Sequence, residues 1–221
     1  MIAVIQCAAR KRPDAGYLRT SQGKPVLFVA DPSKAPACEP CAFARPDDLS
    51  DTGATWRQVL LQYNADPGNN HLGLSPAYQL YSNPAYRRLA DRLGIARTYI
   101  LSAGWGLISA TFLTPQYDIT FSQDAKRKAP YKYRRQQHTY QDLNQLPDST
   151  TDFVVFFGGK DYVPLFCSLT RVLKAPRLLF YNAEQPPEAP GCSLERYRTA
   201  TRTNWHYECV TAFLDGRLQL P

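Results

Sequence analysis

The sequence predicts an α/β fold in a single domain, with a mostly parallel central sheet covered by helices. Short apolar runs alternate with helical patterns along the 221 residues, and several of these runs are apolar on both faces. A strand with two apolar faces is typical of the centre of a covered sheet. Strands that alternate with helices favour parallel pairing, so residues 1–221 are expected to form one domain.

The expected elements follow one another along the chain. Strands are predicted at 2–8, 25–30, 98–103, 152–159 and 177–182. Helices are predicted at 55–64, 84–94, 161–174 and 203–216. Thr55 is a plausible cap of the first helix, and Pro84 and Pro164 fall in first turns, where proline is tolerated. A capping Thr203 or Asn204 is expected to start the last helix.

The segment 31–53 is rich in Pro, Asp and Ser and predicts a long loop, a kind of segment that often carries function or forms a lid. No apolar run reaches about 18 residues, and the first charges follow the short apolar start instead of preceding it. We therefore expect no signal peptide and no membrane span. A chain of this length needs no disulfide to fold, so a reduced cytoplasmic protein is expected.

The net charge of +7 has one local source, a basic arm at 124–138. Six basic residues with no acidic neighbour fall between 126 and 135, and removing them leaves +1 for the rest of the chain. They are Lys126, Arg127, Lys128, Lys132, Arg134 and Arg135. Interleaved tyrosines add faces for bases, so the arm predicts contacts with DNA phosphates. The alternative is a solvated loop that only keeps the protein soluble.

Several polar or aromatic residues follow predicted strands and should meet at one edge of the sheet, where α/β folds bind ligands. Lys11 and Lys160 are expected to contact phosphates there, the second as part of a Gly-Gly-Lys turn that outlines an anion site. A planar base is expected to stack on Trp105 between Gly104 and Gly106. Further base contacts are expected from Tyr117, Asn182 and His206.

Each of these assignments has a structural alternative. Trp105 can be buried, with the glycines making room for its bulk, and His206 can be a packed helix histidine. Cys38 and Cys41 form a single C-x2-C that supplies two of four zinc ligands, and no histidine or cysteine completes it at a standard spacing. We therefore predict no metal and no cofactor.

The ordered motifs resemble a known family. Cys7 followed by Lys11, then PAYQLYSNPAYRRL at 76–89, ILSAGWGLI with a following PxYD, and GGKDY at 158–162 are similar to the YaaA-like family of bacterial proteins. The resemblance implies an α/β fold that binds DNA through a positively charged cleft, in some members with a link to oxidative stress. The chain also looks like defence-associated DNA glycosylases that act on modified phage DNA. The segments 45–64 and 201–209 are extra to the family pattern.

Base excision needs a carboxylate beside the positive charge that develops on the sugar. Asp118 in the PxYD motif is the first candidate, and Asp48 in the long loop is the second. Each can instead be an ordinary turn former or helix cap. The function expected is hydrolytic removal of a nucleobase, with DNA as partner. The alternatives are a non-catalytic DNA-binding stress protein and a hydrolase of free nucleosides or nucleotides.

Overall fold

The computed structural model describes residues 1–37 and 39–218. A seven-stranded sheet forms its centre, in the order β10-β7-β6-β1-β11-β12-β13. All neighbours in this sheet are parallel except β6 and β7. The strands are β1 (Ile2–Gln6), β6 (Thr98–Ser102), β7 (Gly106–Ser109), β10 (Leu143–Asn144), β11 (Val154–Phe157), β12 (Arg177–Tyr181) and β13 (Ser193–Arg196). The predicted α/β fold with a mostly parallel central sheet is confirmed.

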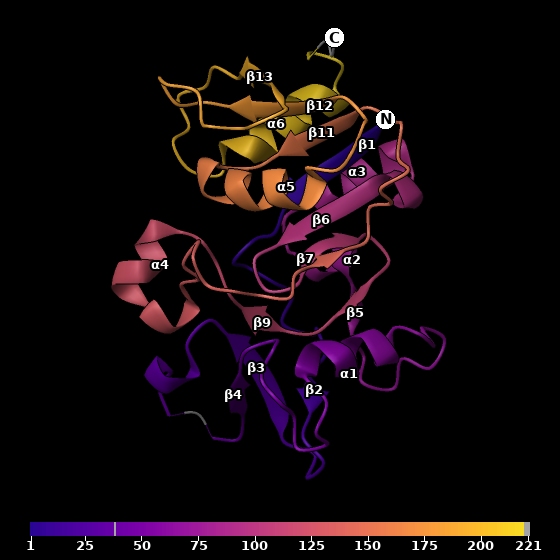
Figure 1. Cartoon of the computed structure of the whole chain (residues 1–221), viewed down its shortest axis with the longest axis vertical. Helices are drawn as coiled ribbons and strands as arrows, with labels where there is room; N and C mark the ends of the chain where they lie inside the picture. Colours follow the sequence, from indigo (N-terminus) through magenta and orange to yellow (C-terminus); the bar gives the residue numbers. More distant parts are fainter. Residues whose placement is uncertain (38, 219–221) are drawn as a thin grey trace.

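Helices cover both faces of this sheet. The helices α3 (Ala85–Leu93) and α6 (Trp205–Leu214) pack against each other, with α3 over β1 and β6 and α6 over β11. On the opposite face, α5 (Val163–Thr170) lies in front of the strands in Figure 1. Right-handed crossovers explain why α3 and α5 lie on opposite faces. The chain passes from β1 to β6 in one direction along the sheet and from β11 to β12 in the other direction.

A second, smaller sheet packs beneath the first (Figure 1). It contains β2 (Leu18–Arg19), β3 (Pro25–Val29) and β4 (Ala42–Ala44), with β9 (Tyr117–Asp118) paired to β3. The helix α1 (Trp56–Tyr63) contacts this sheet through Trp56, whose ring meets Phe28 edge-on at 5.9 Å. A two-stranded pair, β5 (Ser75–Pro76) and β8 (Leu113–Thr114), joins the helix α2 (Ala77–Leu80) to the body. One hydrophobic core runs through both sheets.

The sequence placed most elements correctly and misjudged their ends. Thr55 caps α1 with a full capping box, as predicted. The helix predicted at 161–174 is a short 3-10 turn, Lys160–Tyr162, followed by α5 and ends at Thr170. The last helix begins at Trp205 after Asn204, which has φ 60° and makes no side-chain cap. The strand at 25–30 forms, but in the second sheet, and the loop 31–53 contains β4 and a 3-10 turn, Pro32–Lys34.

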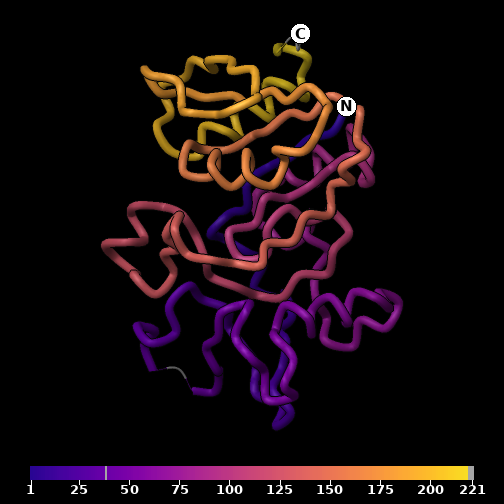
Figure 2. The backbone as a smooth tube through the Cα atoms, viewed as in Figure 1, coloured from indigo at the N-terminus to yellow at the C-terminus, as the bar shows by residue number. Residues whose placement is uncertain are grey.

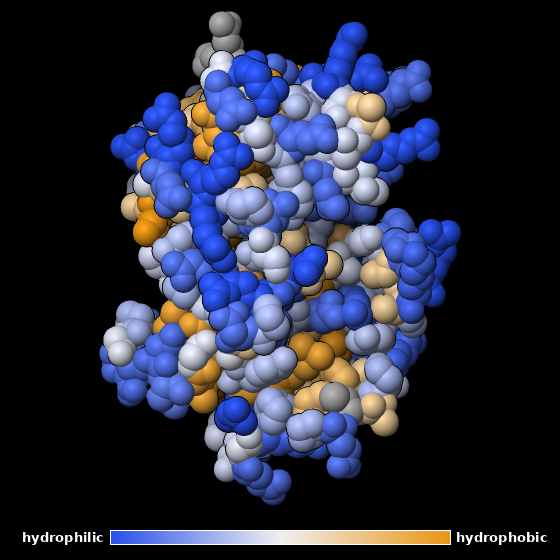
Figure 3. Space-filling model, turned by 180° about the vertical axis from the view of Figure 1, so that it is seen from behind, coloured by the Kyte–Doolittle hydropathy of each residue, from blue (hydrophilic) through white to orange (hydrophobic). Residues whose placement is uncertain are grey.

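The basic arm projects from the side of the molecule between the two sheets (Figure 2). It carries α4 (Gln123–Lys128) and a 3-10 turn, Pro130–Lys132, and returns to β10. Seen from behind, the projecting edge is mostly hydrophilic (Figure 3). No helix in the described ranges is long and apolar enough to cross a membrane.

Candidate functional site

A cavity of about 1120 Å³ opens where β1, β11 and β12 end. Strand β1 is the point at which the topology divides, because the chain adds β6 on one side of it and β11 on the other. Loops that leave neighbouring strands in opposite directions create a crevice at the carboxyl edge of such a sheet. The fold therefore produces a cavity at the edge that the sequence predicted.

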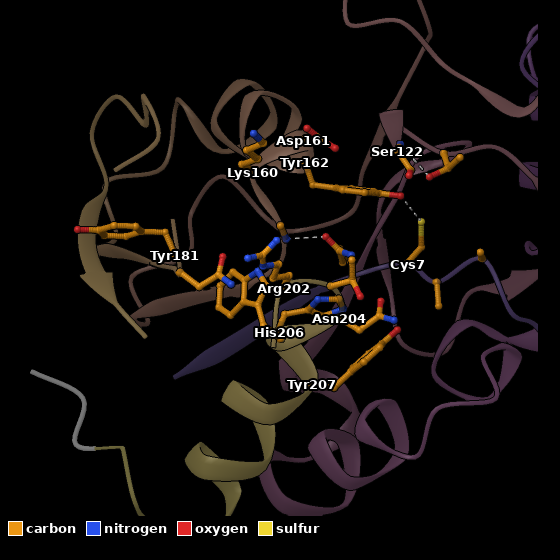
Figure 4. Close-up of a pocket in the computed structure, with 18 of the residues that line it drawn as sticks. Cys7, Ser122, Lys160, Asp161, Tyr162, Tyr181, Arg202, Asn204, His206 and Tyr207 are labelled. Atoms are coloured by element: carbon orange, nitrogen blue, oxygen red, sulfur yellow. Dashed lines mark hydrogen bonds between the residues drawn. The ribbon is translucent and has the colours of Figure 1, made fainter. Parts of the chain in front are cut away.

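The cavity wall combines aromatic faces with amides and cations (Figure 4). The aromatic side chains are Tyr162, Tyr181, Trp205, His206 and Tyr207. The amides and charged groups are Gln6, Asn83, Asn182, Gln185, Asn204, Arg10, Lys160, Arg202 and Asp161. Such a lining suits a planar, polar, anionic ligand, since rings stack on aromatic faces and amides read hydrogen-bonding edges.

Cys7 and Gln6 tie the base of the cavity to the turn after β11. The Cys7 sulfur lies 3.3 Å from the Tyr162 hydroxyl, and Gly159 N–H donates to Gln6 Oε1 at 2.7 Å (Figure 4). The second bond occupies the Gly159 amide, so this amide is not available to the anion predicted at the Gly-Gly-Lys turn. Lys160 is exposed at the rim, as expected of a phosphate contact.

His206 and Asn182, predicted as base contacts, both line the cavity. Burial lowers the pKa of His206 to about 4, so the imidazole is neutral at pH 7. Only 2% of His206 is exposed, and its Nε2 has no hydrogen-bond partner among the described residues. Asn182 donates from Nδ2 to the Thr201 carbonyl at 3.2 Å, which keeps its amide oxygen available.

Asp161 is a cavity carboxylate that the sequence patterns did not single out. It lines the cavity beside Lys160 and is half-buried. Desolvation raises the pKa of Asp161, and the charge of Lys160 opposes that rise. The available signal was its place in GGKDY, directly after a central strand, where a carboxylate faces the binding edge.

Trp105 is fully buried and cannot stack on a base, which corrects that prediction. Its indole packs edge-on against Phe28 at 5.0 Å and Tyr117 at 6.4 Å. The turn after β6 is held by two buried arginines that donate to its carbonyls. Arg57 reaches the Gly104 and Trp105 carbonyls at 3.1 Å each, and Arg134 reaches the Ala103 carbonyl at 2.7 Å.

Gly104 and Gly106 serve packing and not ligand access. A Cβ on Gly104 would lie 3.2 Å from Ile119 and 3.3 Å from Tyr117. Gly106 has φ 93°, and a Cβ there would collide with the Leu143 backbone of β10. Close packing inside the core therefore explains both glycines. This agrees with the alternative in which Trp105 is buried and the glycines make room for it.

Tyr117 and Lys11 form an internal polar cluster and are absent from the cavity wall. Tyr117 is 1% exposed, and its hydroxyl lies 2.7 Å from the Tyr81 hydroxyl and accepts from Ser102 at 2.9 Å. The Lys11 ammonium sits 3.9 Å from the Tyr117 ring centre. Burial lowers the pKa of Lys11 to about 8, although the nearby Cys7 and Asp118 oppose the shift. Base contact by Tyr117 and phosphate contact by Lys11 are not supported by these positions.

The two predicted catalytic carboxylates, Asp118 and Asp48, each bind another side chain outside the cavity. Asp118 pairs with Lys132 at 2.5 Å. Asp48 accepts from the backbone and side chain of Arg45 at 2.8 and 2.9 Å, the bonding of a turn former. Neither belongs to the residues that line the cavity.

The six cations of the arm differ in their surroundings. Arg134 is 4% exposed and pairs with Asp142, so its predicted phosphate contact is wrong. Arg127 and Lys128 are exposed and pair with Asp124. Lys126 and Arg135 are exposed, and neither makes an ion pair with another residue that the structure describes. These two line a smaller cavity, of about 350 Å³, with Asp31, Lys34, Pro130, Tyr133 and His138.

The arm is joined to the large cavity at both ends. Ser122, which precedes α4, lines the cavity. At the other end, Gln136 donates from Nε2 to the Asp161 carbonyl at 2.7 Å. Both ends of the arm therefore lie at the rim of the large cavity.

No group of three or more residues with metal-ligand side chains forms within residues 1–37 and 39–218. The predicted Cys38–Cys41 motif includes Cys38, which lies outside the described residues. Comparison of the chain with protein-family models, with curated proteins and with solved structures finds no match in any of the three. The cavity and the arm are therefore the features of the molecule that bear on its function.

Proposed function

We propose that this protein binds DNA and excises a nucleobase by hydrolysing its N-glycosidic bond. The observation that carries the proposal is the attachment of the basic arm to the cavity rim at Ser122 and at Asp161. A strand held by its phosphates on the arm has a receptacle for an unstacked nucleotide within reach. The resemblance to YaaA-like proteins and to defence-associated glycosylases supports the same function and suggests modified phage DNA as the substrate class.

The cavity has the size and lining for an extrahelical nucleotide. Its volume of about 1120 Å³ is slightly larger than that of ordinary ligand pockets, which span about 300–1000 Å³. Enzymes that act on a base stack the extruded ring on aromatic side chains and read its hydrogen-bonding edge. Tyr181 and Tyr207, the partly exposed aromatic residues of the wall, offer the faces, and Asn182 with the neutral His206 offers the edge contacts.

Asp161 is the residue that we assign to the chemical step. Water attacks C1′ of the sugar while the bond from C1′ to the base nitrogen breaks, and the bonding electrons leave with the base. The Asp161 carboxylate accepts a proton from the water and stabilises the positive charge on the sugar ring. The departing base takes up a proton from solvent and Asp161 releases its proton to solvent, so the products are the free base and an abasic site.

The test is incubation of the protein with DNA that contains ordinary or heavily modified cytosine, followed by assays for abasic sites and released bases. Asp161→Asn should lower the rate about 100-fold or more, because a positioned acid or base contributes at least that much. Asp118→Asn is the matched control and should retain activity within a few-fold. Full activity of Asp161→Asn would remove the catalytic assignment.

The second candidate, a non-catalytic DNA-binding protein, is favoured by the same exposed cations at Lys126 and Arg135. It predicts salt-sensitive binding to DNA with no abasic site on any DNA. Under either candidate, Lys126→Ala with Arg135→Ala should reduce the slope of log affinity against log salt by about 1 for each phosphate that the variant no longer neutralises. An unchanged slope would mean that Lys126 and Arg135 contact no phosphate and that the arm is a solvated loop.

A further inference from the structure

The thiols of Cys167 and Cys192 face each other near the surface, away from the chemistry proposed above. Cys167 lies on α5 and is buried, and Cys192 precedes β13 and is partly exposed. Their sulfur atoms are 3.9 Å apart, and neither is in a disulfide. A bond of about 2.05 Å therefore requires the sulfurs to move about 2 Å closer.

The surroundings make Cys192 the nucleophile of the pair. The hydrogen bond between the two sulfur atoms lowers the pKa of Cys192 to about 7 and raises the pKa of Cys167. Arg177 also favours the Cys192 thiolate: it is buried, and a Cβ on Gly191 would collide with its guanidinium, so the turn that carries Cys192 lies directly against this cation. A thiolate beside an arginine, with a route to solvent, is typical of a reactive cysteine.

The segment that carries Cys192 is an irregular connection between two strands. Residues 182–192 connect β12 to β13 without helix or strand. Near Cys192 the backbone forms one turn, in which the Cys192 N–H donates to the Ala189 carbonyl. Part of the same connection, at Gln185, Pro186 and Pro187, lines the large cavity. A covalent link from Cys192 to α5 would therefore restrain one wall of that cavity.

We propose that Cys167 and Cys192 are a reversible thiol-modification site that closes to an internal disulfide when the protein meets a small-molecule disulfide. The Cys192 thiolate attacks one sulfur of the small disulfide, forms a mixed disulfide and releases one small thiolate. The Cys167 sulfur then attacks the Cys192 sulfur and displaces the second small thiolate, which takes the Cys167 proton. The protein thus loses two hydrogens, and the small disulfide becomes two thiols.

The experiment uses the full chain and oxidised glutathione, followed by alkylation with iodoacetamide, trypsin digestion and mass spectrometry. Trypsin cuts between the two cysteines at Arg171, Lys174 and Arg177, so the disulfide appears as two linked peptides about 2 Da lighter than their sum. We expect the linked pair in the wild type and its disappearance on reduction. Cys167→Ser should instead accumulate glutathione on Cys192, because the mixed disulfide cannot be resolved.

Cys192→Ser should leave Cys167 unmodified, since Cys167 is buried and lacks its partner. Two results would overturn the proposal: a wild type that gives no linked peptides after treatment with oxidised glutathione, or a Cys192 that alkylates no faster than Cys209, which is buried. The rate of Cys192 alkylation should rise as pH passes through about 7. A rise only above pH 8.5 would contradict the role of Cys167 and Arg177 in activating it.

Discussion

Two turns flank the central strand β1 at the same edge of the sheet and have opposite fates. The turn after β6 contains Gly104 and Gly106 and is sealed in the core. The turn after β11 contains Gly158 and Gly159 and borders the cavity. Both are glycine-rich and follow buried strands, so the local sequence alone does not determine which of them borders a cavity.

The two turns differ in exposure because different parts of the chain lie over them. The second sheet covers the turn after β6, where Phe28 of β3 packs on Trp105. The carbonyls of that turn are satisfied by Arg57 and Arg134, and each arginine is neutralised by an aspartate, Asp47 or Asp142. No sheet covers the turn after β11 in the described parts of the chain, and its Lys160 and Asp161 stay at a cavity rim.

Replacing an arginine that donates to the carbonyls of the sealed turn should have the largest effect on stability. Arg134→Met keeps much of the apolar stem but leaves Asp142 buried without its partner and the Ala103 carbonyl without its donor. Breaking a buried ion pair in this way costs about 3–5 kcal/mol of the free energy of unfolding. Denaturant titration measures the decrease.

Arg135→Met is the matched control, because the neighbouring side chain is exposed and should change stability by less than about 0.5 kcal/mol. If Arg134→Met were destabilised no more than Arg135→Met, the sealed turn would not depend on its arginine. The contrast between the two turns would then need another cause.

Adding one methyl group to each turn tests the same contrast at the backbone. Gly106→Ala forces a positive φ on alanine and drives Cβ into Leu143, so it should cost about 2–3 kcal/mol. Gly159 has φ −78°, and the Cβ of Gly159→Ala would meet Gln6 at an ordinary 3.5 Å, so the cost should stay under about 1 kcal/mol. Equal destabilisation in thermal or denaturant unfolding would mean that the two turns are equally constrained.

The fold could be predicted because its signals are local. Apolar runs such as 152–159 mark central strands whatever surrounds them, and Thr55 with Gln58 forms a capping box within four residues. The second sheet could not be predicted, since β9 contributes two residues and pairs with β3 from far along the chain. A two-residue strand has no periodicity to detect.

The site was predicted in part for the same reason. Asn182 and Lys160 follow central strands, and that placement alone locates them at the edge of the sheet where the cavity opens. Trp105 follows a central strand too, but its exposure depends on Phe28 and Arg57, which approach from the second sheet and from α1. Arg134 and Arg135 are adjacent in a basic run, and only the contact with Asp142 separates a structural cation from a free one.

The protonation of His206 at the cavity can be tested through the pH dependence of the free energy of unfolding. Burial holds the pKa of His206 at about 4, whereas an unfolded histidine titrates near 6.5. Between these values the unfolded chain binds a proton that the folded chain does not, so stability falls as pH falls from 6.5 toward 4. Each pH unit corresponds to about 1.4 kcal/mol, so this residue should remove about 2 kcal/mol between pH 7 and pH 5.

The measurement is the difference in unfolding free energy between pH 7 and pH 5, compared between the wild type and His206→Gln. Glutamine does not titrate in this range, so the stability of the variant should fall by about 2 kcal/mol less than that of the wild type over the same interval. Using this difference removes the cost of the substitution itself, because that cost is the same at both pH values. Identical pH dependence in the two proteins would mean that His206 takes up its proton while folded, and its ring would then enter the cavity as a cation able to bind a phosphate instead of a neutral group able to read a base.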